Sequence, residues 1–180
     1  MVIKSLFFDT CAVVKYFINE PGRDVVRWLC EPNTQLLLSL SFSTSEQVEK
    51  ELPIVIDRKA RNGIISVEQA SKIKERAIPY FDSIFHKRDS KPLPNFKYGK
   101  NTDEHQIISK YGLSPDKDRG DAKIISCVVY YLRFLGGASR PHVLTSDKKF
   151  KNIIQGEGYK FIDPEKSTKK EIEEYFLSLH

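Results

Sequence analysis

The sequence predicts an α/β fold built on a central, mainly parallel sheet. Residues 2–8 form a short apolar run with Val, Ile and Phe, which is typical of a buried strand. Residues 35–41, a run of Leu and Ser, predict a second buried strand. Helical spacing between the two runs gives the order strand, helix, strand, which implies a right-handed crossover and parallel pairing. The 180 residues amount to a single domain, 1–180.

The apolar residues between these strands predict two helices. They recur with helical spacing from Ala12 to Phe17 and resume from Val25 to Leu29. Pro21 and Gly22 interrupt the pattern.

Two capping-box signals predict a helical hairpin over about 43–84. Each signal is a serine followed three residues later by Glu or Gln, just ahead of a helical pattern. The two pairs are Ser43 with Glu46, whose helix runs toward Gly63 around Pro53, and Ser66 with Gln69, whose helix runs to about Ile84. The composition then changes to a basic loop over about 85–101.

Helices and strands continue to alternate in the remaining sequence. The most apolar helix of the chain is introduced by Gly120 and Asp121 and stopped by Gly136 and Gly137. The other elements expected are a helix over 103–111, a strand over 142–145, a helix from about Lys148, a strand over 159–162, and a helix over 167–179 with Thr168 and Glu171 as its capping box.

Composition and charge narrow the class of protein. Twenty-nine basic residues against 24 acidic ones give a net charge of +5, which mildly favours an anionic partner such as nucleic acid. Three cysteines without a Cys-x-x-Cys pair signal neither a disulfide framework nor a zinc knuckle. No apolar stretch approaches the ~20 residues of a membrane helix, and the N-terminus lacks a leader pattern. We therefore expect a globular, cytoplasmic protein.

Four acidic residues are expected to meet at one edge of the sheet. Asp9 follows the first strand directly, and Asp147 lies two residues after the third. Glu46 begins the helix that leaves the second strand, and Asp121 begins the apolar helix that returns to the third. Because carboxylates repel one another, such a cluster is typical of a site for Mg²⁺ or Mn²⁺, which activates water without a histidine. The four histidines show no ligand spacing, which argues against zinc.

Each acid also has a purely structural interpretation. Glu46 would be the third residue of a capping box, and Asp121 would interact with a helix dipole. Asp147 would cap the following helix. Asp9 is the hardest to explain structurally, because an acid directly after a buried strand loses hydration unless it is paired or binds a metal.

Four segments, in order, carry these acids within recognisable motifs. The segments are 3–20 (IKSLFFDTCAVVKYFINE), 39–48 (SLSFSTSEQV), 112–126 (GLSPDKDRGDAKIIS) and 142–150 (HVLTSDKKF). Together they resemble the PIN-domain ribonucleases, especially the VapC-like toxins of toxin-antitoxin pairs. Each motif is short, and the signal comes from their order over nearly the whole chain. Cys11 stands where these proteins often carry Ser or Asn, and residues 85–119 are longer than in compact members.

The resemblance implies a three-layer α/β/α fold and Mg²⁺- or Mn²⁺-dependent endoribonuclease activity. It implies a toxin neutralised by a small antitoxin, and it allows a homodimer. A non-catalytic or RNA-processing nucleic-acid-binding module is the alternative. Asp116 and Asp118 compete for the third position. The residues that the resemblance assigns to catalysis are Asp9, Glu46, Asp121, Asp147 and Thr145, the four acids being the metal ligands.

Two basic segments agree with an RNA substrate. Residues 58–76 hold six basic and two acidic residues, and residues 86–100 hold five basic and one acidic residue, so each carries +4. Such surfaces bind phosphates with little sequence preference, and aromatic side chains stack on unpaired bases. A solvated surface is the competing interpretation. The candidate RNA-binding residues are Arg58, Lys59, Arg61, Lys91, Phe96, Lys97, Tyr98 and Lys100.

Overall fold

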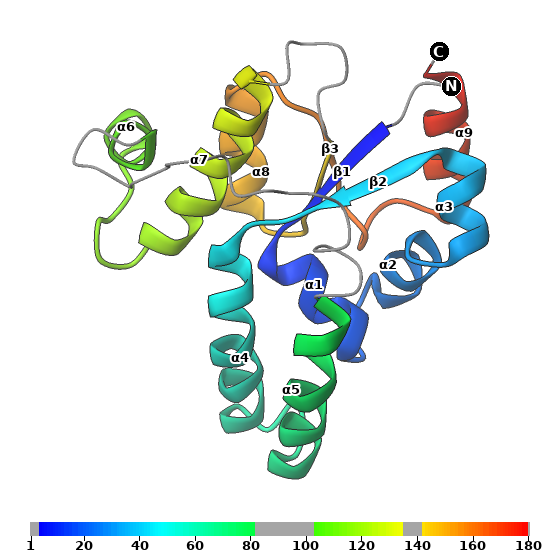
Figure 1. Cartoon of the computed structure of the whole chain (residues 1–180). Coiled ribbons are helices and arrows are strands. Elements are labelled where there is room, and N and C mark those ends of the chain that lie inside the picture. Colours follow the sequence, from blue (N-terminus) through cyan, green and yellow to red (C-terminus); the bar gives the residue numbers. More distant parts are fainter. Residues whose placement is uncertain (1–3, 82–102, 135–141, 180) are drawn as a thin grey trace. The chain divides into compact units, whose positions relative to one another are not determined.

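The computed structural model describes residues 4–81, 103–134 and 142–179 (Figure 1). The chain divides into two compact units, one of Met1–Thr44 with Leu135–His180 and one of Ser45–Phe134. The single domain over 1–180 stays a prediction.

The first unit contains a four-stranded, all-parallel sheet. Its strands are β1 (Lys4–Phe8), β2 (Leu40–Ser43), β3 (His142–Leu144) and β4 (Phe161–Ile162), in the spatial order β2-β1-β3-β4. β1 pairs with β3 through Phe8 opposite Leu144, so these two strands end side by side. The expected α/β class with a parallel sheet is confirmed, and the arrangement is compatible with a three-layer α/β/α fold.

Helices connect the strands of this sheet. The β1 to β2 connection consists of α1 (Thr10–Phe17), α2 (Arg23–Leu29) and α3 (Pro32–Leu38). α8 (Lys148–Gly156) connects β3 to β4, and α9 (Lys169–Ser178) follows β4 with the predicted Thr168 and Glu171 capping box.

The strand predicted over 35–41 is wrong in its position. Residues up to Leu38 belong to helix α3, which has Pro32 in its first turn, and the strand begins only at Leu40. Ser39 separates the two elements in the left-handed conformation, at φ 52°. Leu36 and Leu37 are exposed, so the Leu-rich run is not the continuously buried segment that its apolarity suggested.

The core of the first unit lies on both faces of the sheet. Leu6, Phe7 and Phe8 of β1 are all buried, as expected for a central parallel strand covered on both sides. Phe8 packs edge-to-face on Phe42 of β2, with ring centroids 5.0 Å apart. This packing holds the end of β1, where Asp9 follows, in a defined position.

The second unit is helical and contains the predicted hairpin. Its helices are α4 (Glu46–Arg61), α5 (Val67–Phe81), α6 (Asp103–Tyr111) and α7 (Arg119–Phe134). α4 is one helix through Pro53. The capping box at Ser66 and Gln69 is confirmed, with reciprocal hydrogen bonds of 2.8 and 3.0 Å. The basic loop predicted over about 85–101 lies outside the described residues.

The helix start predicted near Ser43 is wrong by three residues. Ser43 still belongs to β2, where it pairs with Phe7, and its buried hydroxyl has no hydrogen-bond partner among the described residues. Ser45 is the actual N-cap and accepts a hydrogen bond from the Val48 N–H at 3.3 Å. The capping-box spacing was misleading because strand pairing held Ser43 in the sheet.

His142, at the start of β3, couples the stability of the first unit to pH. Its Nε2 lies 2.5 Å from the Tyr175 hydroxyl of α9, and its ring packs against Phe176. Burial, assisted by the positive charge of Lys160, lowers the pKa of His142 to about 4. The imidazole is therefore neutral in the folded protein at neutral pH.

We expect acid to destabilise the protein through His142. Between the ordinary pKa of about 6.5 and the folded value, the unfolded chain binds a proton that the folded chain does not, so stability falls as the pH drops through this window, by up to about 3 kcal/mol. His142→Gln keeps a hydrogen-bonding group without titrating. Urea denaturation should therefore show that the free energy of unfolding falls less between pH 7 and pH 4.5 for the variant than for the wild type. Equal falls for both proteins would contradict this role of His142.

Candidate active site at the ends of β1 and β3

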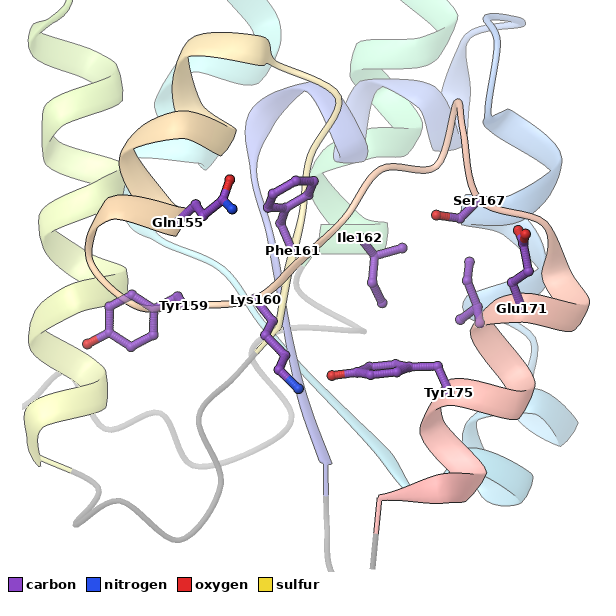
Figure 2. A pocket seen from close by; sticks show the side chains of 9 residues that line it. Gln155, Tyr159, Lys160, Phe161, Ile162, Ser167, Glu171 and Tyr175 are labelled. Carbon is purple, nitrogen blue, oxygen red and sulfur yellow. The ribbon is translucent and has the colours of Figure 1, made fainter.

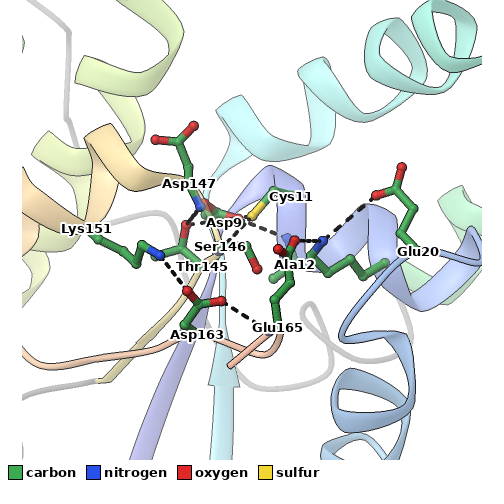
Figure 3. A network of polar contacts seen from close by, with 11 residues as sticks. Asp9, Cys11, Ala12, Glu20, Thr145, Ser146, Asp147, Lys151, Asp163 and Glu165 are labelled. Carbon is green, nitrogen blue, oxygen red and sulfur yellow. Dashed lines mark hydrogen bonds and ion pairs between the residues drawn. The ribbon is translucent and has the colours of Figure 1, made fainter. Parts of the chain in front are cut away.

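Asp9 connects β1 to the first turn of α1. It is only 3% exposed and is the N-cap of α1, with Oδ1 accepting a hydrogen bond from the Ala12 N–H at 2.9 Å. Its other oxygen, Oδ2, accepts a hydrogen bond from the Thr145 hydroxyl (Figure 3). One carboxylate therefore starts a helix and joins two strand ends.

Thr145 and Asp147 form the matching turn after β3. The Thr145 hydroxyl donates to Asp9 and accepts from the Asp147 N–H at 3.1 Å, while the Thr145 N–H bonds to the Ile162 carbonyl of β4 at 3.0 Å. Asp147 is the N-cap of α8, with Oδ1 accepting from the Phe150 N–H at 2.7 Å. The expected approach of Asp9, Thr145 and Asp147 is thus present within the first unit.

Cys11 stabilises the same turn from the side of α1. Its Sγ accepts a hydrogen bond from the Ser146 N–H at 3.2 Å and lies 3.6 Å from the Thr145 hydroxyl oxygen. Burial, reinforced by the charge of Asp9, raises the pKa of the Cys11 thiol well above its ordinary value. Cys11 is therefore a neutral thiol that orients the backbone of the turn.

The electrostatics of Asp9 are unfavourable in the protein alone. Burial raises the pKa of Asp9, the nearby charge of Asp147 adds to this, and hydrogen bonds from Cys11, Thr145 and Ala12 act in the opposite direction. Neither Asp9 nor Asp147 forms an ion pair with a described Lys, Arg or His. Asp9 therefore feels the negative charge of Asp147 without a compensating ion pair from a described cation.

Glu46 and Asp121 belong to the second unit. Glu46 begins α4, is exposed, and forms an ion pair with Lys50 at 3.6 Å. Asp121 lies half-buried in the first turn of α7. The two helices contact each other near these ends, since a Cβ atom on Gly120 would clash with the Glu51 carboxylate of α4. Glu46 is thus the first residue of α4, and Asp121 lies in the first turn of α7.

Two acids after β4 escaped the sequence analysis. Asp163 is buried and forms an ion pair with Lys151 of α8, and Glu165 lies 2.6 Å from the ammonium of Lys15 of α1. Burial alone would raise the pKa of Asp163, but its hydrogen bonds with Lys151 and the Glu165 N–H outweigh burial and lower it. Asp163 follows a strand as Asp9 does, so the rule that located Asp9 would also have located it.

The predicted RNA-binding residues are only partly described. Arg58 and Arg61 are exposed and Lys59 is half-buried, all in the last turn of α4. Five candidates lie outside the described residues: Lys91, Phe96, Lys97, Tyr98 and Lys100.

A cavity of about 480 Å³ lies at another place in the first unit (Figure 2). Its lining comes from the end of α8, the segment that leads into β4, β4 itself and α9, and includes Lys160, Phe161, Ile172 and Tyr175 but not Asp9, Thr145 or Asp147. We therefore place the candidate site at the turns after β1 and β3, where the acids lie, and not in this cavity.

The donor atoms at this site suit a hard divalent cation. Asp9, Thr145 and Asp147 present two carboxylates and a hydroxyl, and Mg²⁺ is commonly bound through one or two carboxylates with water completing its shell. Over the described ranges, no three Asp, Glu, His or Cys side chains are grouped so that they could hold a metal ion. Two carboxylates and a hydroxyl fit an ion that keeps most of its ligands as water, as Mg²⁺ or Mn²⁺ does.

Comparison of the chain with protein-family models finds no match, and comparison with curated proteins finds none either. Among the described helices, none has the length and apolarity needed to cross a membrane.

Thr145 should contribute to stability through its hydroxyl alone. Thr145→Val keeps the shape of this fully buried side chain but removes the hydroxyl that donates to Asp9 Oδ2 and leaves the Asp147 N–H without its acceptor. The free energy of unfolding should fall by about 1–3 kcal/mol. Thr145→Ser, which keeps the hydroxyl, should recover most of it in the same urea titration, and equal losses for both variants would indicate that packing matters instead.

Proposed function

We propose that the protein is a metal-dependent endoribonuclease that hydrolyses RNA phosphodiester bonds. The observation that carries this proposal is the Asp9, Thr145 and Asp147 group at the ends of neighbouring parallel strands. β1 and β3 lie where the chain connections depart toward opposite edges of the sheet, and such a switch point is the usual position of a functional site in an open α/β sheet. The resemblance to PIN-domain ribonucleases supports the same chemistry.

Within the proposal, Asp9 and Asp147 hold Mg²⁺ or Mn²⁺. The bound ion supplies an activated water and stabilises negative charge on the scissile phosphate. Thr145 orients the Asp9 carboxylate and holds the backbone of Asp147, and Cys11 holds Ser146 between them. These contacts position the two acids before an ion or substrate arrives.

The remaining assignments extend this proposal on the basis of the sequence. Glu46 and Asp121, which belong to the second unit, stay ligand candidates on the sequence resemblance alone. RNA is the proposed substrate, a small antitoxin the proposed regulatory partner, a homodimer the proposed assembly and the cytoplasm the proposed location. A neighbouring reading frame for a short DNA-binding protein would support the antitoxin.

A non-catalytic or RNA-processing nucleic-acid-binding module is the second candidate. Asp9 and Asp147 each direct one oxygen at a helix N-terminus, which is a sufficient structural reason for both acids. The two candidates differ in whether the acids are needed for cleavage as well as for folding.

Asp9→Asn should abolish RNA cleavage without unfolding the protein. The amide keeps the size and hydrogen-bonding capacity of the carboxylate but removes a ligand charge. Purified wild-type protein should cleave single-stranded or structured RNA when Mg²⁺ or Mn²⁺ is present, and EDTA should stop the cleavage. Gel electrophoresis of labelled RNA measures both. Asp24→Asn, at an exposed acid of α2, is the matched control and should cleave normally. Cleavage by a folded Asp9→Asn protein at the wild-type rate would exclude the assignment.

The basic end of α4 should contribute to RNA affinity without base preference. Replacing Arg58 and Arg61 by Ala should weaken the binding of unrelated single-stranded RNAs to the same extent. It should also reduce the slope of the logarithm of the binding constant against the logarithm of the salt concentration, by up to about 0.7 for each phosphate that is no longer neutralised. Fluorescence anisotropy over a range of NaCl concentrations measures both effects. The same charge loss at exposed Lys169 and Lys170 of α9 is the control, and equal effects of both pairs would indicate a general charge effect.

A further inference from the structure

Asp147 is followed by a lysine at the spacing of a helical ion pair. Lys151 lies four residues after Asp147, and its backbone N–H bonds to the Asp147 carbonyl at 2.9 Å. Asp147 is the N-cap of α8, and a long side chain in the first turns of a helix leans back toward the helix N-terminus, so the Lys151 side chain can reach the end that Asp147 caps. The chain forms such pairs elsewhere, between Glu46 and Lys50 at 3.6 Å and between Glu68 and Lys72 at 2.5 Å.

Lys151 does not pair with Asp147. Its ammonium forms an ion pair with Asp163 instead, and the side chains of this pair are only 12% and 6% exposed. Asp147 forms no ion pair within the described part of the chain. Figure 3 shows the Lys151 ammonium directed at Asp163, while the Asp147 carboxylate points away from both. The lysine four residues after a proposed metal ligand is thus engaged by a third residue.

Asp163 is held firmly in this arrangement. Its Oδ1 accepts from the Glu165 N–H at 3.1 Å, and its carbonyl accepts from the Lys166 and Ser167 N–H groups at 3.0 and 2.9 Å. The turn also lies tightly against α2, since a Cβ atom on Gly22 would come within 2.7 Å of the Pro164 carbonyl. The carboxylate therefore has little freedom to release Lys151.

We propose that Asp163 is a positioning residue that withholds the Lys151 ammonium from Asp147 and so keeps Asp147 available to a divalent cation. The inference rests on the proposed metal site. An ammonium paired with Asp147 would neutralise a ligand carboxylate and repel an incoming cation. Asp163 prevents this by offering Lys151 a buried partner, where the attraction is less screened than at the exposed end of α8.

The test is a rescue experiment with Mn²⁺ affinity as the readout, measured on the full chain by electron paramagnetic resonance of free Mn²⁺. Asp163→Asn releases Lys151 and should weaken Mn²⁺ binding at least roughly threefold. The double variant Lys151→Met with Asp163→Asn removes the released ammonium and should restore the wild-type affinity. A structural role for Asp163 alone predicts no such recovery.

Glu165→Gln is the matched control. It breaks an ion pair in the same turn but frees Lys15 of α1, which keeps Glu20 at 3.9 Å, so Mn²⁺ affinity should not change. Asp163→Ser, which keeps an acceptor for the Glu165 N–H, replaces Asp163→Asn if that variant does not fold.

The outcomes separate this inference from the proposed function. Unchanged Mn²⁺ affinity after Asp163→Asn, or a double variant as weak as the single one, overturns the role of Asp163 alone. Wild-type protein that binds no Mn²⁺, or that binds it equally after Asp147→Asn, overturns the proposed metal site and this inference with it.

Discussion

The parallel pairing of β1 with β3 is the constraint on which the candidate site depends. Phe8 lies opposite Leu144, so the next residues of the two strands, Asp9 and Thr145, meet at the same edge and join through a hydrogen bond. Because β1 is buried on both sides, a shift of register would disrupt the packing of its aromatic residues as well as separate Asp9 from Thr145. The core and the site are therefore fixed by the same strand pairing.

The helix caps and the proposed metal ligands are the same residues, and the two roles are compatible. Asp9 and Asp147 each use one oxygen to cap a helix. Capping orients each carboxylate, and a carboxylate has further lone pairs through which it can bind a cation. The capping interpretation of Asp147 is thus confirmed, and Asp9 has the same structural role, which the sequence analysis did not assign to it. Neither role removes the functional interpretation. Glu46 departs from the capping-box interpretation, since it is the first residue of α4 after the Ser45 cap rather than the third, and it pairs with Lys50.

Buried charge in the first unit is distributed unevenly around the site. Lys15 and Lys151 are engaged by Glu165 and Asp163, whereas Asp9 has only hydrogen-bond donors. Buried ion pairs contribute little net stability because desolvation offsets their attraction, but breaking one of them is costly. In this protein the ion pairs of Lys15 and Lys151 hold the turn after β4 against α1 and α8, the two helices that Asp9 and Asp147 cap.

The sequence by itself determined the α/β class, most helices, the parallel sheet and the turns that carry Asp9 and Asp147, because these depend on local apolar spacing and on acids that directly follow strands. It misplaced β2, since apolarity alone does not distinguish the partly exposed helix α3 from a buried strand. It also placed a helix start at Ser43, which strand pairing retains in β2. Only the tertiary structure decided which cation each acid meets. Lys151 is four residues from Asp147 but pairs with Asp163, twelve residues away, because β4 ends beside α8 and burial strengthens that contact over the exposed one.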